Sequence, residues 1–311
     1  MSENLLLKAL PTLCAHLTNP DKDVRGPVIA FVGELFAAEN SNLPTMFSTT
    51  FRQWLERFHD SDVSIRKNMV ETSMGILFNQ TDPITIEAVA KVFKSKLCDP
   101  DKEVRRRAVQ CTCELAANGC DNVTNSLLRA VGDRCTDRIA AIRMDAITGL
   151  AQVFRHMISQ QWSQLDDEYD ETGAVPQIRV SQSLHTRLGW IPGHVIKTFN
   201  ISDVELRSRV LQLIDEILLP KSLTAGVRAA GLVHIFGHLD DEAKGVLGRI
   251  FAIRHRIQTV VQEFAQDPKN EDVRCRGIGM PSCSTVDFCC CVIVGDCSIA
   301  PVRFELQECG V

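Results

Sequence analysis

The sequence predicts an all-α protein in which antiparallel helix pairs stack into a continuous array. One short motif, an acidic or Asn-bearing turn followed by an aliphatic residue and an arginine, occurs four times. Its arginines, Arg25, Arg66, Arg105 and Arg143, follow one another at intervals of 41, 39 and 38 residues. The segments between them carry apolar residues at helical spacing. A period of about 40 residues with two helices per unit is typical of HEAT-type α-solenoids.

Each position of the motif has a physical reason. Asp-Pro or Asp-Ser ends the first helix of a pair, because proline cannot continue a helix and aspartate accepts hydrogen bonds from free backbone amides. The aliphatic residue enters the core of the pair. We expect the arginine to reach an acidic turn of the neighbouring unit, which is a structural role. A fifth, looser copy ends at Arg207, 64 residues after Arg143, so an insertion interrupts the period.

The predicted helices fall into two regions. Residues 1–158 contain about four HEAT helix pairs. Their expected ranges are 4–18 with 21–38, 45–58 with 62–78, 83–97 with 101–118, and 121–132 with 137–158. Residues 189–268 form further HEAT-like helices, expected at 190–199, 203–218, 223–237 and 240–267. Such an array is usually a surface that holds other proteins.

Local signals support several of these helix ends. Pro27 lies in the first turns of its helix, where the missing amide costs little. Asp82-Pro83 opens the third pair, and Asn118-Gly119 is a C-terminal capping signal. Pro220 ends the helix at 203–218.

Two segments depart from the helical pattern. Residues 159–188 include the acidic run from Asp166 to Glu171 and are predicted to be a solvated, mobile insertion. An acidic docking site for a basic partner segment is the alternative. Residues 269–311 form a Cys-rich, irregular tail, which we interpret as an alternative or incorrectly assigned C-terminal end with poor packing. A metal-binding or disulfide module is the alternative there, although the cysteine spacing fits no zinc pattern.

Composition excludes several classes of protein. A net charge of −5 argues against nucleic-acid binding by charge alone. No run of 18 apolar residues occurs, so neither a membrane span nor a membrane partner is expected. The first residues lack the basic region of a secretory signal. The cysteines before residue 275 are expected to be small buried hydrophobic residues in a reducing compartment. They are Cys14, Cys98, Cys111, Cys113, Cys120 and Cys135.

Enzyme motifs are absent from the sequence. There is no P-loop, no GxSxG, no HExxH and no CxxC pair. His234 and His238 have metal-competent spacing but are expected to be ordinary surface or half-buried residues. We therefore predict no catalytic, cofactor-binding or metal-ligating residue. The weak candidates for contacts with a phosphate or an acidic peptide, which are otherwise solvated basic residues, are Lys102, Arg106, Arg107, Arg249, Arg254 and Arg256.

Three stretches carry a resemblance to a known family: residues 51–66, 142–154 and 190–261. They contain an FxDxxVxIR block at 58–66 and an LLPxxL block at 218–223, in that order. The chain resembles the middle part of the HEAT-repeat cohesin regulators whose loss causes precocious dissociation of sister chromatids. Members of that family are much longer, so we expect this chain to be a fragment or a truncated isoform.

The resemblance implies a nuclear, chromatin-associated, non-enzymatic protein that maintains sister-chromatid cohesion. It implies binding to the kleisin subunit of the cohesin ring and to the releasing factor Wapl. Some family members also bind an inositol polyphosphate; no other cofactor is expected.

Two other functions compete with this one. A generic HEAT adaptor, such as a condensin-type or phosphatase-type scaffold, would also use Asp-x-x-x-Val-Arg turns. The LLPxxL segment after an acidic insertion favours the cohesin regulator. A direct nucleic-acid binder would need a continuous basic groove, which the net charge of −5 disfavours.

Overall fold

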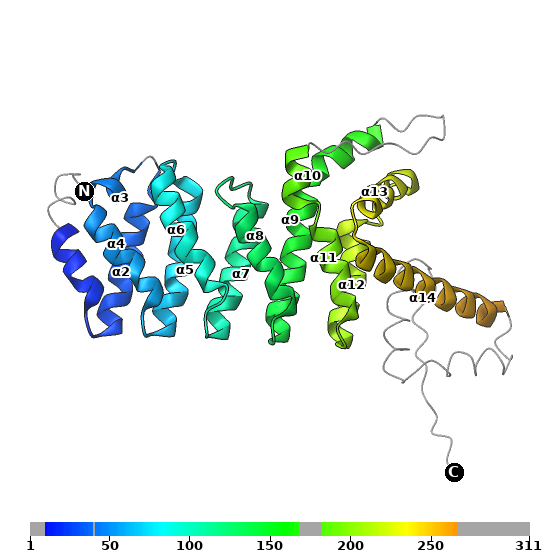
Figure 1. Ribbon diagram of the computed structural model, residues 1–311, viewed down its shortest axis with the longest axis horizontal. Helices are drawn as coiled ribbons and strands as arrows, with labels where there is room; N and C mark the ends of the chain where they lie inside the picture. The colour runs from blue at the N-terminus through cyan, green and yellow to red at the C-terminus, as the bar shows by residue number, and fades with distance from the viewer. Residues whose placement is uncertain (1–9, 40, 168–181, 267–311) are drawn as a thin grey trace, which may run out of the picture.

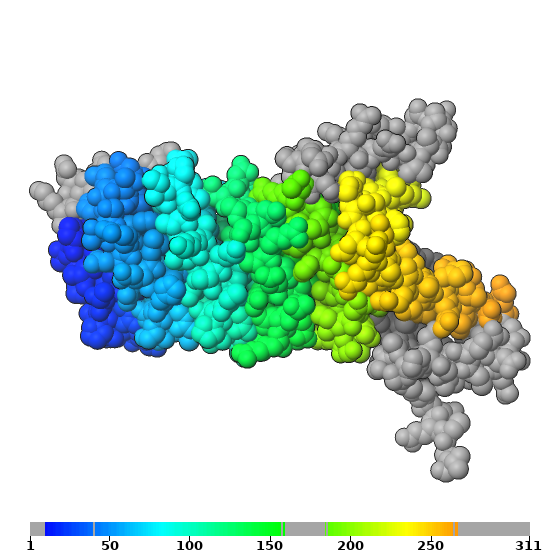
Figure 2. Space-filling model, in the orientation of Figure 1, coloured from blue at the N-terminus to red at the C-terminus, as the bar shows by residue number. Residues whose placement is uncertain are grey.

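The computed structural model describes residues 10–39, 41–167 and 182–266, and every regular element in these ranges is a helix (Figure 1). Helix pairs stack in chain order into an elongated array, from the blue N-terminal end to the orange helix α14 (Figures 1 and 2). The predicted all-α solenoid is confirmed. Among the described helices, none is long and apolar enough to cross a membrane.

The first four pairs follow the predicted order closely. After a helical turn at residues 10–14, their elements are η1 (Ala15–Thr18), α2 (Lys22–Phe36), α3 (Leu43–Met46), α4 (Ser48–Glu56), η2 (Arg57–His59), α5 (Val63–Asn79), α6 (Pro83–Lys96), α7 (Lys102–Ala117), α8 (Asn125–Gly132), η3 (Asp133–Thr136) and α9 (Ala140–Asp167). The second region contains α10 (Gln182–Leu188), α11 (Ile191–Lys197), η4 (Thr198–Asn200), α12 (Val204–Leu213), the π-helix η5 (Ile214–Leu218), α13 (Ala225–Gly237) and α14 (Asp241–Gln266).

The motif arginines lie on the second helices of the pairs, and these helices pack directly on one another. Helix α2 contacts α5, α5 contacts α7, α7 contacts α9, and α9 contacts α12. The aspartates of the motif cap these helices, as the sequence predicts. Asp21, Asp62 and Asp101 each accept hydrogen bonds from backbone amides of the first turn. The cap starts each helix at the same place in its repeat.

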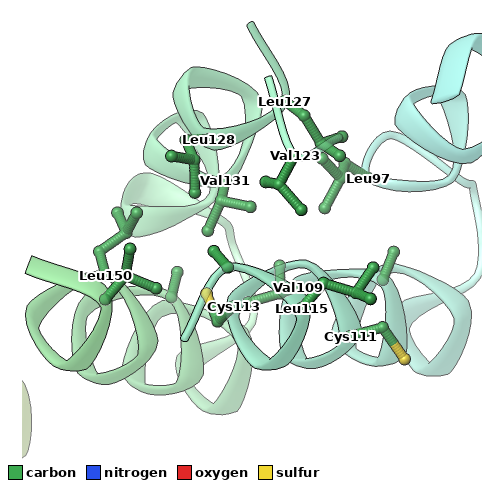
Figure 3. Close-up of a cluster of buried hydrophobic side chains, with 14 of the residues drawn as sticks. Leu97, Val109, Cys111, Cys113, Leu115, Val123, Leu127, Leu128, Val131 and Leu150 are labelled. Carbon is green, nitrogen blue, oxygen red and sulfur yellow. The ribbon is translucent and has the colours of Figure 1, made fainter. Parts of the chain in front are cut away.

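The core runs the length of the array. Near its N-terminal end, Trp54 packs against Phe36, Phe51 and Phe58 with ring centroids 6.0 to 6.2 Å apart. Its indole nitrogen donates to the carbonyl of Ile29 at 2.9 Å, so the buried N–H is satisfied. Figure 3 shows the equivalent core where α7, α8 and α9 meet. The labelled side chains there include Val109, Leu115, Leu127, Leu128, Val131 and Leu150.

The prediction of a mobile insertion at residues 159–188 is partly wrong. Residues 159–167 continue helix α9, and residues 182–188 form helix α10. The sequence from 159 to 167 contains neither glycine nor proline, so nothing ends the helix before the acidic run. Residues 168–181 lie outside the described ranges, as does the whole of the predicted tail at 269–311.

Five of the six cysteines before residue 275 are buried, as predicted, and Cys98 is exposed. Cys98 lies in the turn after α6, beyond the apolar face of that helix. Burial raises the pKa of Cys111 and Cys113 to about 12, so these thiols stay protonated. They act as packing residues.

Candidate functional site

A ladder of buried and partly buried ion pairs joins successive repeats. Each of the four motif arginines donates to a carboxylate of the repeat that follows. The four rungs are Arg25–Asp60, Arg66–Asp99, Arg105–Asp137 and Arg143–Asp203. The structural role predicted for these arginines is confirmed.

The first three rungs share one geometry. In the third, Arg105 donates from Nε and Nη2 to the two carboxylate oxygens of Asp137, at 2.9 and 3.2 Å. Its remaining nitrogen, Nη1, donates to the carbonyls of Asp99 and Pro100 in the preceding turn, at 2.9 and 3.1 Å. The guanidinium therefore ties its own helix start to the next repeat, which suits the fixed fork of arginine.

The fourth rung differs because its acidic residue stands elsewhere. In the first three rungs the aspartate lies six residues before the next arginine, but Ile201 occupies that position before Arg207. Arg143 instead pairs with the helix cap Asp203, four residues before Arg207. The shifted carboxylate leaves Nε of Arg143 buried without a partner. The irregular rung follows the insertion that breaks the period.

The ladder ends at the fifth motif copy. Arg207 donates to the carbonyl of Phe199 at 3.0 Å and makes no ion pair within the described ranges. Asp240, which caps α14, pairs with Lys197 at 2.8 Å. Beyond this point α14 is held by other contacts, including the paired hydrogen bonds from Arg254 to Asp215 at 2.8 and 3.0 Å.

The buried aspartates stay charged. Burial would raise the pKa of Asp60, Asp99 and Asp137, but the arginine hydrogen bonds and neighbouring positive charges outweigh it, and the pKa of each carboxyl is lowered. The same pairing raises the pKa of Arg25 and Arg66. Each rung is therefore fully ionised at neutral pH.

A second set of contacts crosses the repeats at the surface. The residue five positions after a motif arginine meets the residue two positions after the next one. Glu71 accepts from Arg107 at 2.7 Å, Asp145 accepts from Gln110 at 2.8 Å, and Thr148 accepts from Arg209 at 3.1 Å. We call these contacts the surface row. They pair polar side chains of α7, α9 and α12 with side chains of neighbouring repeats.

A groove lies beside this surface row. It has a volume of about 610 Å³ and is lined by α7, α9 and one residue of α12. Small residues make its floor: the sulfur of Cys113 packs against Gly149 so closely that a Cβ at position 149 would stand 2.5 Å from it. Longer side chains rise around this floor, among them Glu114, Met144 and Gln152. The sequence does not predict this groove, because its two walls come from different repeats.

The six candidate basic residues lie in two separate groups on α7 and α14. On α7, Arg106 pairs with Asp145 and Arg107 with Glu71, both at 2.7 Å. Lys102 is exposed and makes no hydrogen bond or ion pair with the rest of the described chain.

On α14, Arg254 is paired with Asp215, and Arg249 donates to the side chain of Asn200 at 2.6 Å. Arg256 is exposed and has no such contact in the described ranges. Four of the six basic side chains, all of them arginines, thus already have partners within the chain. A role of any of the six in partner binding stays a prediction.

A family model and the curated relatives of this chain point to the same family. A family model described as "Sister chromatid cohesion protein PDS5 protein" matches residues 1–278. The sister chromatid cohesion protein PDS5 homolog B of Gallus gallus is 23% identical over 275 residues, which cover 87% of this chain and 18% of that protein. Homolog A of Homo sapiens is 23% identical over 261 residues, covering 84% of this chain and 18% of that protein.

The fold comparison agrees with the sequence comparison. A chain from the solved structure titled "Structure of the Pds5-Scc1 complex and implications for cohesin function" matches with a TM-score of 0.69 at 16% identity. The match covers 84% of this chain and 37% of that one. At this identity the match establishes a shared fold. The chain spans 18% of the length of the two PDS5 homologs and 37% of the Pds5 chain. It therefore corresponds to a minor part of each of these proteins.

Proposed function

The chain belongs to the PDS5 family of sister chromatid cohesion proteins, and from this membership we propose that it is a non-enzymatic scaffold that binds the kleisin subunit of cohesin and regulates sister-chromatid cohesion. The observation that carries the proposal is the family match over residues 1–278. The shared fold with a Pds5 protein whose structure is titled as a complex with Scc1 supports it.

The ladder supports a scaffold role on physical grounds. Each of the first three rungs fixes the orientation of one repeat relative to the next, since a buried fork of hydrogen bonds tolerates little rotation. A rigid array presents its surface residues at constant spacing, so it loses less conformational entropy when an extended partner binds. The proposed function needs this preorganised surface and no reaction centre.

A binding measurement with the full chain tests the proposal. The recombinant kleisin subunit of cohesin, fluorescently labelled, is titrated with the chain, and anisotropy is recorded. We expect saturable binding that an unlabelled kleisin competes away. If the chain shows a helical circular dichroism spectrum and a cooperative melt yet does not bind, the proposal is wrong.

The same assay separates the proposal from the generic adaptor. A condensin kleisin and a phosphatase catalytic subunit serve as alternative labelled partners. Preference for the cohesin kleisin supports the cohesin regulator. Equal or tighter binding of either alternative partner supports the adaptor.

We also propose the remaining properties that the family resemblance implies: a Wapl-type partner, a nuclear location and an inositol polyphosphate ligand. Pull-down of a Wapl-type releasing factor, imaging of a fluorescent fusion and calorimetric titration with inositol hexakisphosphate test them in turn. Failure of any one leaves the kleisin measurement intact, because each has its own readout.

A further inference from the structure

The groove between α7 and α9 has three polar side chains that are free to bind a ligand. Glu114 on α7, Asn118 in the turn directly after α7 and Gln152 on α9 line it, and all three side chains are exposed. None of them makes a hydrogen bond or ion pair with another described residue. They offer one carboxylate and two side-chain amides to a ligand.

The other polar side chains of the groove are already engaged within the chain. Asp145 accepts from both Arg106 and Gln110, at 2.7 and 2.8 Å. Arg209 donates to Thr148 at 3.1 Å and to Gln212 at 3.3 Å. The only carboxylate in the groove without such a partner is therefore that of Glu114, among the residues that the structure describes. Arg209 also lines the groove and bonds only to uncharged side chains, so charge complementarity favours a positive ligand group at Glu114 itself and not along the whole groove.

The dimensions suit a short stretch of peptide. One wall of the groove runs from Gln110 on α7 to Asn118, the C-cap of that helix, and these two residues are eight positions apart, which corresponds to about 12 Å along a helix. An extended peptide of about four residues covers that length. The free amides of Asn118 and Gln152 can each donate to and accept from a peptide backbone. Cys113, Ala117 and Gly149 also line the groove and add short side chains to its surface.

We propose that this groove binds an extended, basic peptide segment of a protein partner, with Glu114 receiving a lysine or arginine side chain and Asn118 and Gln152 bonding the peptide backbone. The proposal goes beyond kleisin binding, because it assigns a site and a ligand chemistry that do not depend on which protein carries the segment.

Met144 provides a local reporter for the test. It lines the groove, whereas Met46 on α3 is exposed far from it. The full chain is labelled with ¹³C at the methionine methyl groups and titrated with an acetylated and amidated hexapeptide of alternating alanine and arginine. A second hexapeptide has glutamate in place of arginine. We expect the arginine peptide to shift the Met144 resonance and leave Met46 unchanged, and the glutamate peptide to shift neither.

A matched pair of variants then locates the charge contact. Glu34 on α2 and Glu114 on α7 lie at the same position of their repeats, nine residues after the motif arginine, and both are exposed. Glu114→Gln should weaken binding of the arginine peptide about two- to fivefold, the range of exposed ion pairs. Glu34→Gln removes the same charge outside the groove and should leave the affinity unchanged.

Three results would overturn the proposal: no shift of Met144 with the arginine peptide, an equal shift with the glutamate peptide, or equal losses in the two variants. The last result would indicate general attraction to an acidic protein. None of these outcomes bears on kleisin binding, which is measured separately.

Discussion

At the scale of the residue, the ladder depends on arginines that have lost nearly all contact with water. In the third rung the side chains of Arg105 and Asp137 are 6% and 2% exposed. Removing one member leaves the other charge buried without its main partner, which costs far more than losing a pair at the surface. Arg106, the next residue along, also pairs with an aspartate, yet its side chain is 42% exposed. Two adjacent arginines thus have opposite energetic roles.

This contrast gives the first prediction. Arg105→Ala should lower the free energy of unfolding by about 3–5 kcal/mol. Arg106→Ala should lower it by at most about 1 kcal/mol. Midpoints of urea unfolding, followed by circular dichroism, measure the difference. Replacing both members, with Arg105→Met and Asp137→Leu, should cost less than Arg105→Ala alone. Equal losses for the two single variants would contradict the ladder.

At the scale of the element, the same helix position is buried or exposed according to whether a repeat precedes it. The residue before the motif arginine is 3% exposed in Ile65 of α5 and packs against Gly26 of the preceding α2. Its equivalent in α2, Val24, is 40% exposed. Six residues after the arginine, Phe31 of α2 is 37% exposed, whereas Cys111 of α7 is fully buried. Helix α2 therefore presents an interface face that the described residues leave partly exposed.

The second prediction compares equivalent positions in α2 and α5. Ile65→Asp should destabilise the protein strongly, because it places a charge in the interface between α2 and α5. Val24→Asp is the matched change at the exposed equivalent and should alter the unfolding midpoint little. Thermal melts of the two variants provide the comparison. A loss for Val24→Asp as large as that for Ile65→Asp would show that Val24 is covered in solution.

Glycines on α9 and α14 give the third prediction. At Gly149 an added Cβ would collide with Cys113 of α7, so Gly149→Ala should destabilise by about 1–3 kcal/mol. At Gly245 nothing lies within 4 Å, so Gly245→Ala should stabilise α14 by about 0.5–1 kcal/mol. Chemical unfolding of both variants tests this. The same sign of change in both would argue against the close contact of α7 with α9.

At the scale of the whole molecule, the ladder makes the stability of the array depend on pH in the acidic range. The pKa values of Asp60, Asp99 and Asp137 are lowered in the folded chain, and hydrogen bonds led by that from the Ser64 hydroxyl lower the pKa of Asp62 to about 2. A carboxyl whose folded pKa lies below its unfolded value of 3.8 stabilises the fold above that value. The stabilisation is lost as the pH falls through the folded pKa.

The fourth prediction follows from the lowering of these pKa values in the folded chain. These carboxyls should leave stability nearly constant from neutral pH down to about pH 4 and reduce it progressively towards about pH 2. Urea midpoints across this range measure the effect. Asp137→Asn should make the chain less stable at neutral pH and reduce the dependence on acid, because one of the coupled carboxyls is gone. An unchanged acid dependence in that variant would contradict the assignment.

The candidate site was only partly predictable from sequence. The rungs at Arg25, Arg66 and Arg105 follow from a motif whose arginine and acidic turn recur at fixed spacing. The shifted rung at Asp203 does not, because the sequence cannot show which of two nearby positions faces Arg143. The partners of Arg106 and Arg254 were also missed, since each lies 39 residues away on another helix.

The sequence by itself determined the repeat, the helix starts and the role of the motif arginines, because caps, prolines and apolar spacing act within a few residues of one another. Only the tertiary structure decided which charges are already paired, where α9 ends and where a groove opens. Those features arise when side chains from different repeats meet, and a difference of one position along a helix decides whether two groups touch.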